Sequence, residues 1–510
     1  MRRFKGFSFV GGWLALFLVA HSLFAQDTDS RPSQGPAPKA GGAAIANYVD
    51  LIRLIESTVN VDSWQAAGGN SSMMEFRNGV RINADGLIER FDESKIVSLE
   101  IKPATNGKDP SLISLESLGE WQEPSSLRWI SLSELDRQLT ERKYARATSA
   151  MEMLGGLYRI DYVAFDPDSK GWFLGGPSGS LVLTQSGDIL NSETGLPPVL
   201  LEDLLTIAPH ILGGKGEFGC SIDPDPKRLV ESSRLVSTSA SIKALARNPD
   251  RWVEGWRKSL GKQNAKVVGI PQDSPTGYAL LIADAQMKRL AFDLEFRPIE
   301  LKSYWQEVET FGQARDDMGL VRWWFSLTDD KIPMDPDRRI YHFASSNVRV
   351  ESEAQMLNEQ GKKVVSNVPD TAADAYARSF TRNFASLQKE HPCLGRLRHI
   401  FDLSVALEIV RLEMEKGNGK PLAFLSNDEI QPRMATSPKA IDSIASTHTM
   451  PNGTISAVIS GGVSIQLGQL PSRVKIDKQS IRSVSFEPSE GKSEATMPPS
   501  ATCTEIPFWR

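Results

Sequence analysis

The sequence has few of the residues from which reactive sites are usually built. Its 510 residues include three cysteines and six histidines. The cysteines, Cys220, Cys393 and Cys503, are too few and too far apart for a disulfide framework, and at least one thiol must stay unpaired. We expect small buried apolar residues at Cys220 and Cys393 and a tail cysteine at Cys503.

The motifs of common enzyme classes are also missing. There is no P-loop and no His-Glu-x-x-His helix, and residues 176–180, GPSGS, fail the nucleophile-elbow pattern at their last position. His391 and Cys393 flank Pro392, but two possible ligands in a tripeptide are weak evidence for a metal site. The sequence therefore predicts no metal and no cofactor, although distant residues could still assemble a catalytic triad.

The chain also has no excess of basic residues. The chain has 58 basic and 63 acidic residues, a net charge of −5. Without the three basic residues of the first 25, the balance is 55 against 63, a net charge of −8. Because nucleic-acid-binding proteins carry a clustered basic face, we expect no nucleic-acid partner.

The only long apolar run is at the start of the chain. Arg2, Arg3 and Lys5 precede an apolar segment, 9–20, and a cleavage-like Leu23-Phe24-Ala25. This pattern predicts a signal peptide over 1–25, a mature start at Gln26, and an exported protein, periplasmic or extracellular, with no stable membrane span after cleavage. An uncleaved anchor is the alternative, because no charge occurs between Phe7 and Gln26.

The remaining chain, with 40% hydrophobic and 24% charged residues, is long enough for more than one domain. Composition and turn residues predict a disordered tether over 26–46, a small helix plus β-hairpin unit over 47–102, a linker over 103–124, a main domain over 125–416, a β extension over 417–472 and a disordered tail over 473–510. The hairpin turn is expected at Asn78-Gly79.

The stretch 265–295 is where we place the centre of the main domain. Val267 to Ile270 is a short β-branched run, and Ser274 and Pro275 supply the N-cap and first residue of a helix with two apolar stripes. A second helix, 394–416, is apolar almost all round in its middle and should be buried. With the strands around them, these helices predict an α+β fold: a mixed α/β core with helices on a mixed sheet.

Four polar residues of this domain form a candidate cluster: Asp284, Lys288, Arg322 and Asp402. Asp284 and Lys288 lie four residues apart on one helix, which suits either an ordinary exposed ion pair or a polar site near a cleft. Asp402 lies in an apolar helix and needs a partner, for which Lys288, Arg322 and Arg398 are candidates. Both a structural salt bridge and a functional site are consistent with this pattern.

Trp323 and Trp324 are candidates for an aromatic contact site. They belong to the run Arg322-Trp323-Trp324-Phe325, which is predicted to be a strand. Because consecutive residues of a strand point to opposite faces, we expect each tryptophan to pack or bind on a different face of the sheet.

Several stretches together carry a resemblance over about 125–416. They are Gly156-Leu157-Tyr158-Arg159, Cys220-Ser221-Ile222-Asp223-Pro224, Ala283-Asp284 with Met287-Lys288, Arg322-Trp323-Trp324-Phe325, Phe380-Thr381 and Asp402-Leu403. In order and spacing the chain resembles a family of exported planctomycete proteins, domain of unknown function 1598. It departs from that pattern around 176–184, where Ser178-Gly179-Ser180 replaces an expected aromatic residue. The resemblance implies no activity.

Two classes of function follow from these observations. The first, favoured by the tether, the tail and the missing motifs, is a non-enzymatic binding or cell-envelope interaction protein whose partner is an unknown protein or envelope component. The second is an extracytoplasmic hydrolase whose acid and base come from Asp284, Asp402 or Asp223. A deep pocket with two of these carboxylates would favour the hydrolase, and an apolar patch around Trp323 or Trp324 would favour binding.

Overall fold

The computed structural model describes residues 120–477, except for gaps at 143–146, 185–186, 237, 296, 299, 312–318, 359–361, 431–434, 436 and 451–452, together with residues 508–509 and four short strands before residue 120. The chain divides into two compact units, Met1–Asn47 and Tyr48–Arg510, and all described residues belong to the second. The predicted signal peptide and tether lie outside the described residues. No described helix is long and apolar enough to cross a bilayer.

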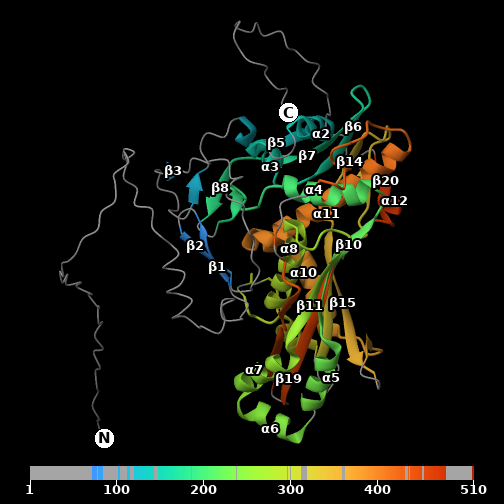
Figure 1. Cartoon of the computed structure of the whole chain (residues 1–510). Coiled ribbons are helices and arrows are strands. Elements are labelled where there is room, and N and C mark those ends of the chain that lie inside the picture. Colours follow the sequence, from blue (N-terminus) through green and yellow to red (C-terminus); the bar gives the residue numbers. More distant parts are fainter. Residues whose placement is uncertain are drawn as a thin grey trace, which may run out of the picture. The chain divides into compact units, whose positions relative to one another are not determined.

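The largest element is an eight-stranded sheet with the order β16-β15-β12-β19-β10-β11-β17, in which β18 also pairs with β19 (Figure 1). Only β12 and β19 run parallel, so the sheet is mixed. Its strands are β10 (Glu217–Pro224), β11 (Lys262–Val268), β12 (Gly319–Leu327), β15 (Val348–Leu357), β16 (Lys363–Val365), β17 (Ala440–Asp442), β18 (Ala445–Met450) and β19 (Gly453–Gln466).

The two faces of this sheet differ. Along β11, Gln263, Ala265 and Val267 are buried while the alternate residues are exposed, as the two-residue period of a strand requires. On the buried face lie α8 (Pro275–Ala291), α9 (Tyr304–Phe311) and α10 (Thr371–Glu390), and beyond them α11 (Pro392–Glu415) contacts both α8 and α10. On the other face, α5 (Pro226–Val236), α6 (Ser239–Arg247) and α7 (Pro249–Leu260) cover one end, where Trp256 packs with Leu320 and Val458.

Three smaller sheets complete the described part. A six-stranded mixed sheet has the order β20-β13-β14-β6-β7-β5, a four-stranded sheet the order β3-β4-β8-β9, and β1 pairs with β2. Their strands are β1 (Ser72–Phe76), β2 (Gly79–Asn83), β3 (Lys102–Pro103), β4 (Leu112–Ser114), β5 (Ser125–Ser131), β6 (Tyr162–Asp166), β7 (Gly171–Ser178), β8 (Leu181–Thr184), β9 (Ile189–Asn191), β13 (Ile332–Met334), β14 (Ile340–His342) and β20 (Val474–Ile476). The remaining helices are α2 (Leu132–Arg142), α3 (Ser149–Glu152), α4 (Leu201–Leu212) and α12 (Leu470–Arg473).

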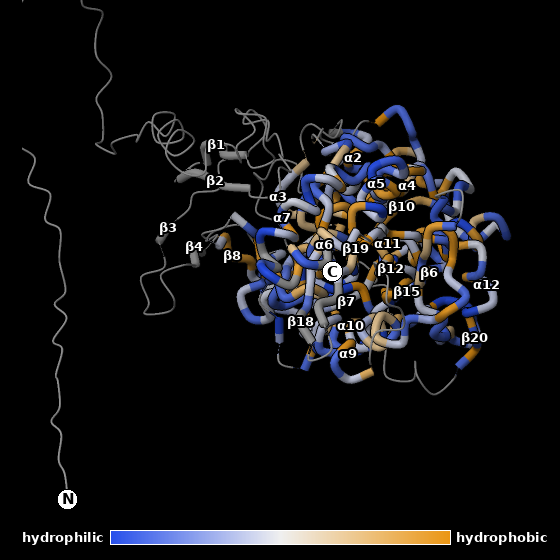
Figure 2. The backbone as a smooth tube through the Cα atoms, turned by 90° about the horizontal axis from the view of Figure 1, so that it is seen from below, coloured by the Kyte–Doolittle hydropathy of each residue, from blue (hydrophilic) through white to orange (hydrophobic). Residues whose placement is uncertain are grey.

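The central stretch folds as its sequence predicts. Ser274 Oγ accepts a hydrogen bond from the Gly277 N–H and caps α8, which begins at Pro275. The helix ends at Ala291, earlier than the pattern suggested, because Asp293 turns the chain with φ 56°. Leu294 is therefore exposed instead of extending the buried stripe. The buried helix α11 and the mixed α/β core are confirmed. In Figure 2, apolar segments of the chain gather in the interior of the described part.

Two of the segments expected to surround the main domain, the linker and the β extension, take part in its sheets. The predicted hairpin is present as a separate two-stranded sheet: β1 pairs with β2 from Ser72↔Asn83 to Phe76↔Gly79, and the turn between Phe76 and Gly79 lies outside the described residues. Residues 112–114 of the expected linker form β4, which pairs with β8. The expected β extension contains β17, β18 and α12, and its residues 453–466 form one strand, β19, at the middle of the eight-stranded sheet. Gly461 and Gly462 both lie within this strand, at positions where the neighbouring strands leave no room for a Cβ.

The expected disordered tail also contributes residues to the fold. β20 pairs with β13, and Phe508 is buried in the main core. The proline- and serine-rich composition of 473–510 did not reveal these contacts, because two short segments at its ends carry them.

Candidate functional site

Asp284 and Lys288 form an ion pair that is wholly buried. One helical turn separates them on α8, and Lys288 Nζ lies 2.6 Å from Asp284 Oδ2. Their side chains are 0% and 1% exposed, so the expectation of a partly exposed pair was wrong: the sheet covers this face of α8. Burial raises the pKa of Asp284, and the Lys288 charge opposes that rise.

Gly461 of β19 makes room for this pair. A Cβ on Gly461 would lie 2.6 Å from Asp284 Oδ1 and 3.0 Å from Lys288 Cε. The neighbouring Gly462 has a φ of 151° and lies against the backbone of Cys220. Because Gly461 has no side chain, the charge pair packs directly against the sheet at this position.

The two described cysteines carry no reactive thiolate. Cys220 is buried beside the Asp284–Lys288 pair, and burial raises its pKa well above the ordinary value. Burial also raises the pKa of Cys393 to about 12. Because the thiolate is the nucleophile and the metal ligand, the raised pKa keeps both thiols protonated at neutral pH. Among the described residues, no group of three or more His, Cys, Asp or Glu side chains could hold a metal ion.

Asp402 lies in a second, separate network. Its Oδ2 accepts a hydrogen bond from Arg398 Nε at 3.2 Å, one turn earlier on α11, and its Oδ1 accepts one from Asn347 Nδ2 at 2.8 Å. Arg473 Nη2 in turn donates to Asn347 Oδ1 at 2.8 Å. Of the three partners considered from the sequence, Arg398 is therefore the one that Asp402 uses. Burial raises the pKa of Asp402, and Arg398 lowers it.

A third buried network was not predicted from the sequence. Arg396 Nε and Nη2 donate to both carboxylate oxygens of Asp203 at 3.0 Å, and Thr276 Oγ1 donates to Asp203 Oδ1 at 2.7 Å. These residues come from α11, α4 and α8, so the network joins three helices. The signal that pointed to Asp402, a carboxylate in an apolar helix, was also present at Asp203 in the run Leu201–Leu212.

Asp223 and Arg322 lie on the less covered face of the eight-stranded sheet. Lys363 Nζ donates to Asp223 Oδ1 at 2.6 Å, and the Asp223 side chain is 38% exposed. Arg322 stacks over the Trp324 ring at 5.0 Å and joins neither buried carboxylate. The four residues of the candidate cluster are thus divided: Asp284 with Lys288, Asp402 with Arg398, and Arg322 with Trp324.

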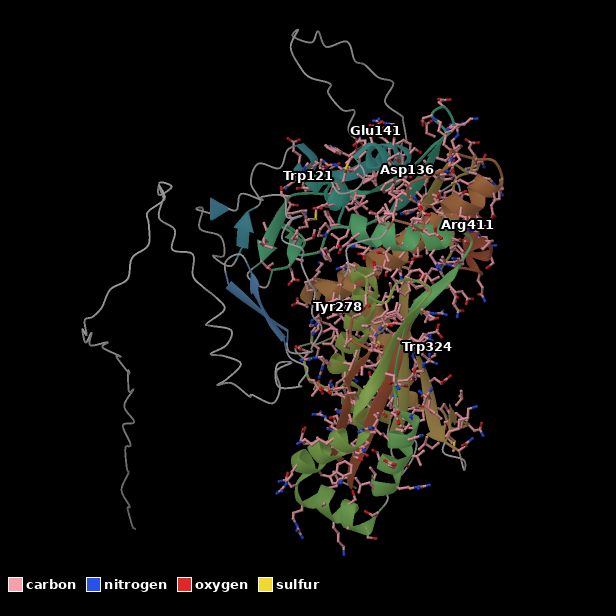
Figure 3. All side chains as sticks on the ribbon, viewed as in Figure 1. Trp121, Asp136, Glu141, Tyr278, Trp324 and Arg411 are labelled. Carbon is pink, nitrogen blue, oxygen red and sulfur yellow. The ribbon has the colours of Figure 1, made fainter. Side chains whose placement is uncertain are left out.

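Trp323 and Trp324 point to opposite faces, as the strand period predicts. Trp323 is fully buried and donates from Nε1 to the Ala373 carbonyl of α10. Trp324, labelled in Figure 3 beside the long strands, is half-buried. Its neighbours across the strands are Glu351 on β15 and Gly462 on β19. Since Gly462 has no side chain, one flank of the indole has no side chain directly opposite it.

This arrangement offers structural ion pairs inside and a mixed aromatic and charged surface outside. Asp284 and Asp402 are both 0% exposed, and each is paired with a base within one helical turn. General acid–base catalysis requires a carboxyl group within hydrogen-bonding reach of a substrate. The geometry gives neither residue that access.

Residues 220–304 match a protein family described as "Protein of unknown function (DUF1598)". The match runs from Cys220 in β10 to Tyr304 in α9, and it includes the Asp284–Lys288 pair. No curated protein and no solved structure matches the chain. The chain therefore contains a domain of the DUF1598 family over these residues.

Proposed function

We propose that this chain is a non-enzymatic binding protein that holds a cell-envelope component on the open part of the eight-stranded sheet. The observation that carries the proposal is the half-buried Trp324 with Arg322 stacked on its ring, 5.0 Å from the ring centre. Glu351 and Glu353 lie across from these two residues on β15. A flat indole surrounded by charged hydrogen-bonding groups suits a ligand with apolar faces and many hydroxyls, which is the chemistry of a glycan.

Small residues beside Trp324 also favour ligand binding on this face of the sheet. Ser460, Gly462 and Ser464 of β19 lie directly across from Arg322, Trp324 and Ser326 of β12. On the next strand, Ser221 pairs with Gly462. Next to the indole an extended ligand would meet Gly462 and the half-buried Ser464, whereas Lys363 and Gln355 cover Ser460 at the other end of the row.

The hydrolase alternative depends on accessible carboxylates. Asp284 and Asp402 are buried in ion pairs, and Asp223, the accessible one, is neutralised by Lys363. This distribution favours binding over acid–base chemistry.

The proposal also includes a location outside the cytoplasm, which the charged and apolar pattern of residues 2–25 supports. The intact mass of protein recovered from cells tests that placement: cleavage gives a chain beginning near Gln26, and a full-length cytoplasmic chain would contradict it.

Co-sedimentation with insoluble cell-wall glycan tests the binding site. Trp324→Ala should weaken binding by at least tenfold, because a central tryptophan commonly dominates an interface. Trp129→Ala is the matched control, since Trp129 is a half-buried tryptophan of the six-stranded sheet. Equal binding by both variants, or no binding by the unmodified chain, would contradict the proposal. Glycan shortened during the assay and protected by Asp223→Asn would instead favour the hydrolase.

A further inference from the structure

The outer edge of β5 holds the segment Phe508–Trp509. β5 is the last strand of the six-stranded sheet and pairs with β7 on one side only. On its other side the Ser131 N–H donates to the Phe508 carbonyl at 2.8 Å, and Ile130 forms an antiparallel bridge with Trp509. The segment thus adds to the sheet as an extended peptide does in β-augmentation.

Both aromatic side chains are anchored. Phe508 is 1% exposed and belongs to the main hydrophobic core, and Trp509 packs against that core. The two rings meet edge to face with centroids 4.8 Å apart. In peptide recognition, backbone hydrogen bonds to a strand edge supply affinity and side-chain pockets supply specificity, and both are present here.

A strained turn forms part of the same site. Leu154, Gly155 and Gly156 have successive φ values of 39°, 63° and 76°. A Cβ on Gly155 would lie 2.7 Å from Ile130 Cδ1 and 3.5 Å from Trp509 Cβ, so this turn lies against both partners of the bridge. Strained backbone of this kind persists where its surroundings hold it and is common at ligand clamps.

A buried cation fixes the turn to β5. Arg128 is 6% exposed, and its Nη1 donates to the carbonyls of Gly155, at 2.7 Å, and of Trp121. Its Nη2 donates to the Glu123 carbonyl at 3.0 Å. Trp121 is labelled near this end of the molecule in Figure 3. The guanidinium thereby holds the 154–156 turn in place on the strand that receives Phe508 and Trp509.

We propose that the β5 edge and the 154–156 turn form a peptide-binding site for two adjacent aromatic residues on an extended chain, with the Phe508–Trp509 segment of this chain as its ligand. The described contacts between this segment and the rest of the chain come from Phe508 and Trp509. This inference is independent of the glycan-binding proposal, because the two sites lie on different sheets.

Cutting the chain between the body and the segment tests this site. A protease recognition sequence placed within 487–500 allows the full chain to fold before it is cut. After the released fragment has been washed away under mild denaturant and the body returned to buffer, a labelled peptide of residues 504–510 should bind to the body, as measured by fluorescence anisotropy. The same peptide with Phe508→Ala should bind at least 100-fold more weakly, because it loses a fully buried ring. A peptide of identical composition with the two aromatic residues separated is the control.

Each outcome decides the proposal. If the body keeps its circular dichroism and cooperative unfolding but does not bind the peptide, or binds all three peptides alike, the proposal is overturned. If the body loses its fold after cutting, the peptide is added during refolding. Recovery of the fold by the natural sequence and not by the Phe508→Ala peptide supports the site, and failure of both to restore it overturns the proposal.

Discussion

At the level of single residues, the buried carboxylates provide the clearest chemistry. Asp402 has no solvent contact and accepts hydrogen bonds from Arg398 and Asn347, which connects α11 to the residue preceding β15. A buried ion pair is weak evidence for extra stability, but removing one partner leaves an uncompensated charge. Removing one partner should therefore lower the free energy of unfolding more at a buried ion pair than at an exposed one.

Asp402→Ala should lower the free energy of unfolding by about 3 to 5 kcal/mol, because Arg398 loses its carboxylate and Asn347 loses an acceptor. Glu141→Ala, which breaks an exposed i,i+4 pair with Arg137 on α2, should lower it by only about 0.3 to 0.5 kcal/mol. Urea unfolding of both variants measures the difference. A fully stable Asp402→Ala protein would show that Asp402 is not a structural partner.

His399 predicts a dependence of stability on pH. It is buried, its Nε2 lies 2.9 Å from the Tyr158 carbonyl, and burial lowers its pKa from 6.5 to about 4. Above pH 6.5 both folded and unfolded states hold neutral His399. Between pH 6.5 and 4 only the unfolded state takes up the proton, so the free energy of unfolding should fall by about 1.4 kcal/mol per pH unit from this group.

His399→Gln provides the comparison, since glutamine can donate to Tyr158 but does not titrate in this range. The difference in unfolding free energy between the two proteins should therefore change as the pH falls from 6.5 to 4. Parallel pH profiles for the two proteins would contradict the assignment of a neutral, buried His399.

At the level of elements, the sequence was most informative where local rules decide the structure. The cap at Ser274, the proline at the start of α8 and the apolar circumference of α11 are local signals, and all three are confirmed. The opposite facing of Trp323 and Trp324 follows from the strand period alone. These features need no knowledge of distant parts of the chain.

Pairings between distant segments could not be predicted in the same way. The parallel pairing of β12 with β19 joins residues more than 130 positions apart, and nothing local in 453–466 indicates a central strand. For the same reason the separation of Asp284 from Asp402 was not apparent. The Asp203–Arg396 network could not be predicted either, because the two residues lie 193 positions apart in the chain.

Gly461 shows how one element depends on another. A Cβ there would collide with the Trp323 carbonyl of β12 and lie 2.6 Å from Asp284 Oδ1 on α8. Gly461→Ala should therefore lower the free energy of unfolding by at least about 1 to 3 kcal/mol, as overpacking does. Gly255→Ala in α7, where nothing lies within 4 Å of the new methyl group, should raise it by about 0.4 to 1 kcal/mol. Thermal unfolding of both variants measures these changes. If Gly461→Ala leaves the free energy of unfolding unchanged, β19 does not pack closely against Asp284.

At the level of the whole molecule, three buried charge networks connect the layers of the described part. Asp284–Lys288 lies between α8 and β19, Asp402–Arg398 with Asn347 connects α11 to β15, and Asp203–Arg396 joins α4 to α11. The matched domain over 220–304 contains only the first of these networks entirely. The surface that we propose for binding is carried by the same eight-stranded sheet, so the buried pairs fix the framework on which Trp324 is held.

The free energy of unfolding of an Asp284 and Lys288 mutant set tests most directly whether the buried pairs are structural. Asp284→Ala alone should lose about 3 to 5 kcal/mol, because it leaves the Lys288 ammonium buried and unpaired, whereas Asp284→Leu with Lys288→Met should stay near the stability of the unmodified chain or exceed it. If Asp284→Ala is as stable as the unmodified chain or more stable, the pair resembles a strained functional site, and the binding-protein account is contradicted.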